Sequence, residues 1–177
     1  MLNDLITSKT RIRLMMKFFI NEHTTGYLRS LAAEFGESTN AIRSELNRFE
    51  AAQLLTVQSE QNKKIYRANT RHPYYGEMHR LLLKYVGIDH LVEQVISRLG
   101  ALQRAYVTGD FARGNPGKLL DLLLIGTRID HNYLQSLIRK AEENVSFTIR
   151  CLTLTPDQEA EYVKNQEDVL LVWESDK

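Results

Sequence analysis

Residues 28–69, which read LRSLAAEFGESTNAIRSELNRFEAAQLLTVQSEQNKKIYRAN, decide the fold of the first part of the chain. Apolar residues at helical spacing predict a short helix over residues 27–34, and Gly36 ends it because glycine readily adopts the left-handed conformation. A second helix is expected over residues 38–52, with a serine or threonine at its start as the N-cap. The β-prone runs LLTVQSE and KKIYRAN then flank the polar pair QN, which indicates a hairpin.

One more helix is predicted before this stretch. Thr7 or Ser8 can cap it, and it ends near Asn21-Glu22. Its apolar residues recur at the spacing of one helical face, and they are Ile12, Met15, Met16, Phe19 and Ile20. Three helices followed by a hairpin within residues 1–72 is the element order of a winged helix-turn-helix.

The quoted stretch also resembles the DNA-binding domain of bacterial ArsR-type and related repressors. In those domains a short helix, a tight turn and a recognition helix that opens with small polar residues precede a Leu-Leu pair and the wing. The chain differs at Gln53, where the family usually has glycine before the Leu-Leu. The resemblance implies a winged helix-turn-helix DNA-binding domain over residues 1–72.

The rest of the chain predicts a helical linker and a small α/β domain. Two helical segments over residues 73–100 follow the wing and are expected to form a linker and dimerisation element. Their apolar seam consists of Leu81, Leu82, Tyr85, Leu91, Val95 and Leu99. Over residues 101–177 strands and helices alternate, which is typical of a small α/β domain. The fold class predicted for the whole chain is therefore α+β.

Residues 107–126, VTGDFARGNPGKLLDLLLIG, carry the motif of the second domain. The stretch is similar to the start of the active site in the nucleotidyltransferase superfamily. Those enzymes have a Gly-Ser turn, an Asp-x-Asp pair on the next strand and a third carboxylate on a later strand. The resemblance implies a nucleotidyltransferase-like fold over residues 101–177. The expected vestigial nucleotide site consists of Gly109, Asp110, Arg113, Gly114 and Asp121.

Three departures from the superfamily's pattern fall on the groups that perform the reaction. Leu119 stands where the first aspartate of the pair would be, and leucine provides no oxygen ligand for a hard cation. Asp110 replaces the serine that cradles phosphate, and its charge would repel a triphosphate. The later strand provides Thr148 and Arg150 in place of an acid. We therefore expect a retained fold without catalytic residues, and no metal or cofactor.

Two other interpretations of this motif remain open. The glycines can form a plain turn between two strands, with Asp121 pairing with Arg113 or accepting hydrogen bonds from turn N–H groups. Alternatively, Asp110 and Asp121 hold a metal ion together in an altered arrangement.

The first domain carries the residues that we expect to bind DNA. In a recognition helix, residues near the N-terminus read base edges, and neighbouring polar residues contact phosphates. Arg43 suits a bidentate contact to guanine and Asn40 a contact to adenine, while the polar wing suits phosphates or the minor groove. The expected DNA-binding residues are Ser38, Thr39, Asn40, Arg43, Ser44, Asn47, Arg48, Gln61, Asn62, Lys63, Lys64 and Arg67.

Charge and composition limit the class of protein. Residues 1–72 hold 11 Lys and Arg against 7 Asp and Glu, whereas residues 73–177 hold 12 against 15. The basic half is thus the half with the helix-turn-helix pattern, which suits a polyanionic partner. No apolar run approaches the roughly 20 residues that span a bilayer. The single cysteine, Cys151, agrees with a reducing cytoplasm, and the five histidines are scattered without metal-ligand spacing.

Together these features predict a cytoplasmic transcriptional regulator, a repressor that binds double-stranded operator DNA as a homodimer. The degenerate second domain would sense a nucleotide or a protein partner, or support the dimer. One alternative is an active minimal nucleotidyltransferase that modifies a partner protein, with the winged helix for autoregulation. Another is an interaction module in which the winged helix binds a protein instead of DNA. No membrane partner is expected.

Overall fold

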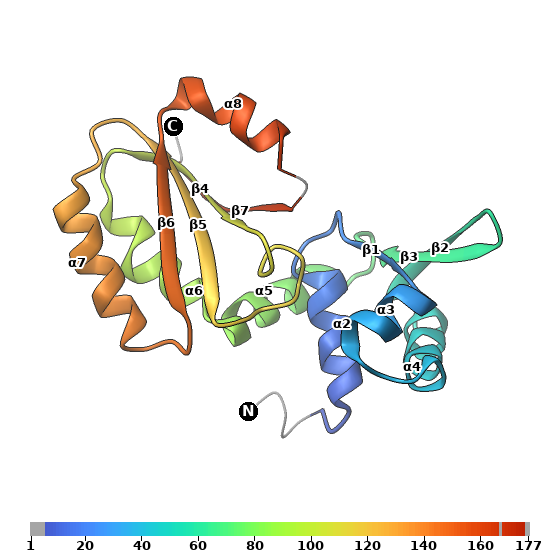
Figure 1. Cartoon of the computed structure of the whole chain (residues 1–177). Helices are drawn as coiled ribbons and strands as arrows, with labels where there is room; N and C mark the ends of the chain where they lie inside the picture. The colour runs from blue at the N-terminus through green and yellow to red at the C-terminus, as the bar shows by residue number, and fades with distance from the viewer. Residues whose placement is uncertain (1–5, 167, 176–177) are drawn as a thin grey trace. The chain divides into compact units, whose positions relative to one another are not determined.

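Figure 1 shows the computed structural model of the chain, which describes residues 6–166 and 168–175. The chain forms two compact units, residues 1–82 and residues 83–177. Each unit has its own β-sheet, three-stranded in the first and four-stranded in the second. No helix in the described part of the chain is long and apolar enough to cross a membrane.

The first unit is a winged helix, as the sequence predicts. Its elements are α2 (Lys9–Phe19), β1 (Thr25–Tyr27), α3 (Leu28–Phe35), α4 (Thr39–Ala51), β2 (Leu55–Glu60) and β3 (Lys63–Ala68). The sheet is antiparallel with the strand order β1-β3-β2. Strands β2 and β3 form the hairpin of the wing, and α3 and α4 form the helix-turn-helix (Figure 1).

Capping residues set the helix boundaries of this unit, and the three predicted helices are confirmed. Ser8 caps α2, because its Oγ accepts a hydrogen bond from the backbone N–H of Arg11 (3.2 Å). Gly36 ends α3 with a φ of 64°, and Ser38 caps α4. Gln53, after α4, has a φ of 57°. This left-handed conformation favours glycine, which explains the glycine of the ArsR-type pattern at this position.

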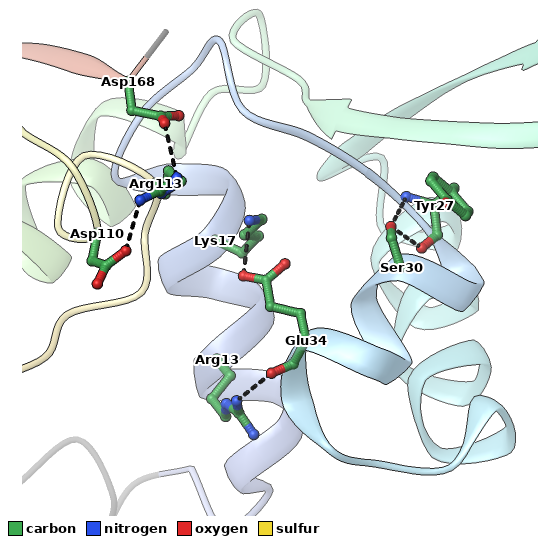
Figure 2. A network of polar contacts seen from close by, with 8 residues as sticks. All are labelled: Arg13, Lys17, Tyr27, Ser30, Glu34, Asp110, Arg113 and Asp168. Atoms are coloured by element: carbon green, nitrogen blue, oxygen red, sulfur yellow. Dashed lines mark hydrogen bonds and ion pairs between the residues drawn. The ribbon is translucent and has the colours of Figure 1, made fainter. Parts of the chain in front are cut away.

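Strand β1 is not predicted from the sequence. It has only three residues, too few for an alternating pattern, and it forms by pairing with β3, where Gly26 lies opposite Tyr66. A Cβ on Gly26 would lie 2.9 Å from the side chain of Leu31. The N–H of Tyr27 donates to Ser30 Oγ (3.2 Å), and the Ser30 hydroxyl donates to the Tyr27 carbonyl (2.8 Å; Figure 2). These bonds fix the start of α3 directly after the strand.

Ion pairs join α2 to the helix-turn-helix around an apolar core. The fully buried core side chains include Phe18, Phe19, Leu31, Ile42 and Leu46. Arg11 Nε lies 2.9 Å from Glu45 Oε2, and Lys17 Nζ lies 2.9 Å from Glu34 Oε1 (Figure 2 shows the second pair). Lys17 and Glu45 are both buried, and a buried charge is tolerated only when it is paired.

The predicted linker, residues 73–100, contributes to both units. It contains α5 (Tyr75–Val86), α6 (Ile88–Gln94) and the short 3₁₀ helix η1 (Ile96–Arg98). The boundary between the units lies within α5. After it, Leu91, Val95 and Leu99 pack in the core of the second unit, while Leu81 on α5 is exposed. Dimerisation through this segment stays a prediction.

A mixed sheet forms the centre of the second unit, and the predicted α/β character of this unit is confirmed. Its elements are β4 (Leu102–Thr108), β5 (Leu119–Gly126), α7 (His131–Glu142), β6 (Thr148–Leu154), α8 (Pro156–Lys164) and β7 (Val169–Glu174). The strand order is β6-β5-β4-β7. Strands β5 and β6 are parallel, with α7 as their crossover, and the other neighbours are antiparallel.

One face of this sheet packs in the apolar core, and the other face carries a buried polar cluster beside the buried side chains of Leu123 and Ile125. On one face, alternate leucines of β5 between residues 120 and 124 pack in the apolar core with α6 and α7. On the other face, Glu159 of α8 accepts hydrogen bonds from Arg104 Nε (2.5 Å) and from the Tyr106 hydroxyl (2.6 Å). Glu159 is 8% exposed, and these donors satisfy its buried carboxylate.

The same hydrogen bonds change the acidity of the groups. The hydrogen bond from Arg104 holds the pKa of Glu159 below its ordinary value. Burial, together with the bond to Glu159, raises the pKa of Tyr106 to about 12. At neutral pH the cluster therefore contains a carboxylate, a guanidinium and a protonated phenol.

Replacement of Glu159 by glutamine should destabilise the second unit by roughly 1–3 kcal/mol at pH 7, because the Arg104 guanidinium loses a charged acceptor. The pKa of Glu159 is lowered in the fold, so its contribution is complete above the ordinary glutamate value of about 4.3. The contribution is lost as the pH falls through the lowered value, so the variant and the parent should converge in acid. Urea unfolding followed by the fluorescence of Trp173, the single tryptophan, measures the difference.

Glu161→Gln, an exposed glutamate on the same helix, is the matched control and should change stability by less than about 0.5 kcal/mol. An equal loss in both variants, or a difference that persists unchanged in acid, would contradict the role given to Glu159.

Candidate functional site

The outward face of α4 carries the residues that the sequence predicts to read DNA bases. Ile42, Leu46 and Phe49 turn one face of this helix into the core. The helical repeat then leaves the opposite face for solvent or a ligand. The predicted residues of this segment are all exposed, and they are Ser38, Thr39, Asn40, Arg43, Ser44, Asn47 and Arg48.

Neighbouring side chains hold two of the arginines on α4. Arg43 Nη1 donates to Oδ1 of Asn40, one turn earlier (3.1 Å). The first two turns of the helix therefore present a guanidinium and an amide side by side. Arg48 Nη1 lies 3.7 Å from Oε1 of the buried Glu45, toward the other end of the helix.

The wing presents a polar tip next to two lysines. Gln61 and Asn62 have φ angles of 43° and 67°, as in a type I′ hairpin turn. Both side chains are exposed, as are those of Lys63 and Lys64. Lys64 Nζ lies 3.6 Å from Oε1 of Glu50 near the end of α4, so the part of the wing next to its tip faces α4.

A groove with a volume of about 510 Å³ lies between α4 and the wing. Half of the predicted DNA-binding residues line it, and they are Arg43, Asn47, Gln61, Asn62, Lys63 and Lys64. The other predicted residues, Ser38, Thr39, Asn40, Ser44, Arg48 and Arg67, are exposed outside the lining of the groove. Arg67 lies on the other face of the wing, because strand side chains alternate and Tyr66 faces inward. Its Nη2 donates to Gln58 Oε1 (2.9 Å).

Five further residues line the groove without being predicted to bind DNA, and they are Tyr27, Leu28, Arg29, Leu46 and Tyr66. Arg29 is exposed in the first turn of α3, and its position as the first basic residue of the helix-turn-helix is a signal that could have found it. Lys63 Nζ lies 4.8 Å from the centre of the Tyr27 ring, a cation–π contact. Tyr27 reaches the groove through β1, which depends on a pairing that the sequence pattern does not reveal.

The glycine turn of the second unit closes between β4 and β5. Gly109 and Gly114 have φ angles of 67° and 72°, which favour glycine. The N–H of Arg113 donates to the carbonyl of Gly109 (3.0 Å), and the N–H of Asn115 donates to the carbonyl of Asp110 (2.9 Å). The backbone of the turn therefore favours glycine at both positions.

Three aspartates near this turn pair with arginines. Asp110 Oδ1 lies 2.8 Å from Arg113 Nη2, and Arg113 Nη1 lies 3.2 Å from Asp168 Oδ2 (Figure 2). Asp121 Oδ1 lies 2.5 Å from Arg150 Nε. The interpretation that Asp121 pairs with Arg113 is therefore wrong, because the parallel register of β5 and β6 places Asp121 beside Arg150.

The residues at this turn do not fit the two metal ions of the nucleotidyltransferase superfamily, which need several carboxylate oxygens. Leu119 supplies no ligand, and Arg150 supplies a cation where a third carboxylate would stand. Asp110 and Asp121 are the two residues that would hold a metal ion together in the altered arrangement. Each of them has an arginine partner. Within the described residues, no group of three His, Cys, Asp or Glu is arranged to hold a metal ion. A cavity of about 440 Å³ borders Gly109, Asp121 and Arg150.

Cys151 is a partly buried residue beside the core of the second unit. It follows Arg150 on β6, points to the opposite face of the sheet and packs against the apolar core. Burial raises the pKa of its thiol to about 12, so the thiol is protonated at neutral pH and a poor nucleophile.

No family model and no curated protein matches the sequence. Solved structures with partial similarity include the antimony-specific transcriptional repressor AntR, which is 24% identical, with 52% of this chain and 78% of AntR covered at a TM-score of 0.38. A candidate nucleotidyltransferase from Sulfolobus solfataricus is 17% identical, with 62% of this chain and 96% of that chain covered, also at a TM-score of 0.38.

Gly109→Ala and Gly114→Ala should each destabilise the second unit by roughly 1–2 kcal/mol, because a Cβ is unfavourable at positive φ. At Gly109 the added Cβ would also lie 3.2 Å from Asp121 Oδ2. Gly117→Ala, where a Cβ meets open space, is the matched control and should be nearly neutral. Urea unfolding ranks the three variants.

Asp121→Asn should cost less stability than either of the first two glycine variants, because the partner guanidinium of Arg150 is largely exposed and exposed ion pairs contribute little. A larger loss for Asp121→Asn than for the glycine variants would contradict the small contribution given to the ion pair with Arg150.

Proposed function

We propose that this protein is a DNA-binding transcriptional repressor that reads operator DNA through its winged helix. The observation that carries the proposal is the convergence of α4 and the wing on one basic groove. Arg29, Arg43, Lys63 and Lys64 line this groove from three elements, and over the described residues its lining contains no acidic side chain. Such a surface suits the negative charge of a DNA backbone.

The recognition helix supplies the base contacts in this proposal. The major groove of B-DNA admits an α-helix, and Arg43 in the second turn of α4 suits a bidentate contact to guanine O6 and N7. Asn40, which accepts the hydrogen bond from Arg43, suits adenine or orients the guanidinium toward guanine. Ser38 and Thr39, at the exposed start of the helix, would contact a neighbouring phosphate.

The wing supplies the backbone contacts. Lys63 and Lys64 would neutralise phosphates of the strand that passes the groove, with Gln61 and Asn62 at the edge of the minor groove. Repressor operators are commonly partial palindromes, so we propose that two copies of the chain bind together, with residues 73–100 as the dimerisation element. The second unit then acts without catalysis, as a sensor for a nucleotide or protein partner or as support for the dimer.

An active minimal nucleotidyltransferase is the alternative, and the retained glycine turn with Asp121 beside it is the observation that favours it. Incubation with labelled nucleoside triphosphates and Mg²⁺ or Mn²⁺ separates the two functions. We expect no transfer of label, because the carboxylates near the turn are paired with arginines. Robust transfer to the chain or to an added protein would overturn the non-catalytic part of the proposal.

Arg43→Ala should weaken binding to a duplex selected from random DNA by roughly 1–3 kcal/mol, because one bidentate base contact is lost. Binding to unselected DNA should change much less. Arg139→Ala, on the exposed face of α7, is the matched control and should leave both affinities unchanged. An equal loss on selected and unselected DNA would show that Arg43 contacts only phosphate.

Simultaneous Lys63→Gln and Lys64→Gln should weaken binding to all duplexes similarly. The slope of log K against log salt concentration should fall by roughly 0.9 for each phosphate contact that is lost. Lys140→Gln with Lys164→Gln, two exposed lysines of the second unit, provides the matched control. An unchanged slope would show that the wing tip does not contact DNA. If the parent protein shows no salt-dependent DNA binding, the result would favour the alternative in which the winged helix binds a protein instead of DNA.

A further inference from the structure

The groove between α4 and the wing has an apolar floor beneath its basic rim. Leu46 is 1% exposed and Tyr66 is 5% exposed, and both line the groove together with the ring of Tyr27. A basic rim alone would serve a sugar–phosphate backbone, whereas an apolar floor matches the flat hydrocarbon surface of a small ligand. The volume of about 510 Å³ also lies within the range of small-molecule sites.

The hydroxyl of Tyr66 is free to bind a ligand in the groove. The residue as a whole is 5% exposed. Its hydroxyl bonds to no other side chain among the described residues and still reaches solvent, because the buried side-chain atom without a partner there is His90 Nε2. The residue faces the groove, where the charges of Lys64, Glu50 and Arg43 act on it. Burial raises the pKa of this phenol, so its proton is available for donation at neutral pH.

The rim of the groove supplies positive charge from three directions. Arg29 belongs to α3, Arg43 to α4, and Lys63 and Lys64 to the wing. An apolar floor, an unpartnered hydroxyl donor and a cationic rim are the groups that bind a flat apolar ring carrying one carboxylate.

We propose that this groove is an effector site for a small aromatic carboxylate and that an occupied groove excludes DNA. The ring lies on Leu46 and Tyr66, the carboxylate accepts hydrogen bonds from the Tyr66 hydroxyl and from Arg43, and the ligand fills the space between α4 and the wing. The exclusion of DNA rests on the proposed function, because Arg43 and Lys64 would otherwise contact the operator. Binding of the carboxylate itself does not depend on that function.

Titration of the full chain with 2-naphthoate, followed by the fluorescence anisotropy of the ligand, tests the site without DNA. We expect saturable binding of one molecule per chain, with neutral 2-naphthamide binding at least tenfold more weakly. Tyr66→Phe should weaken naphthoate binding by roughly tenfold, the value of one hydrogen bond to a charged acceptor. Tyr133→Phe, on an exposed tyrosine of the second unit, should have no effect.

A second variant covers the case in which Tyr66→Phe disturbs the fold. Arg29→Gln changes an exposed rim residue and should weaken naphthoate binding several-fold while leaving the unfolding midpoint unchanged. The site is overturned if naphthoate does not bind saturably, or if the parent, Tyr66→Phe and Arg29→Gln proteins bind it equally.

Release of a labelled duplex by 2-naphthoate, with 2-naphthamide as the control, tests the exclusion of DNA. Release that follows the occupancy measured in the direct titration supports the proposal, and a complex that holds both ligands together overturns it. If the chain binds no DNA, the repressor proposal fails, and the titration without DNA still decides whether the effector site exists.

Discussion

Glu45 is a carboxylate on the inner face of α4, and the position of this helix depends on how the buried charge is satisfied. Burial raises the pKa of the carboxyl group, but the hydrogen bonds from Arg11 and Ser8 outweigh burial and lower the pKa below its ordinary value. Arg11 Nε lies 2.9 Å from Oε2, and the Ser8 hydroxyl donates to Oε1 at 2.9 Å. Loss of either partner would leave a poorly compensated buried charge, so this cluster fixes α2 against α4.

The orientation of the candidate DNA-binding residues follows from this constraint. Arg43 and Asn47 are each two positions from Glu45, and two positions correspond to about 200° around a helix. When Glu45 points into the core, these two side chains point outward into the groove. The ion pair of Lys17 and Glu34 likewise fixes α3, which carries Arg29, against α2. Helix α2 thus determines the geometry of a groove to which it contributes no lining residue.

Features with a local cause are predictable from the sequence, and features that depend on distant pairing are not. Ser8, Gly36 and Ser38 act through bonds or backbone angles within their own turn, so the helix boundaries of the first unit follow from the sequence. The outward polar face of α4 follows from helical periodicity. The groove itself needs β1, which exists only because it pairs with β3, and so Tyr27 and the unpartnered hydroxyl of Tyr66 escape a sequence-based prediction.

The pair of Asp121 and Arg150 shows the same dependence on pairing in the second unit. The two residues are 29 positions apart, and only the parallel register of β5 and β6 brings them together. A guanidinium that is attached to the neighbouring strand already neutralises much of the charge on this carboxylate, and a divalent cation would have to displace it. Asp121 therefore has a partner within the fold, and its presence does not by itself indicate metal chemistry.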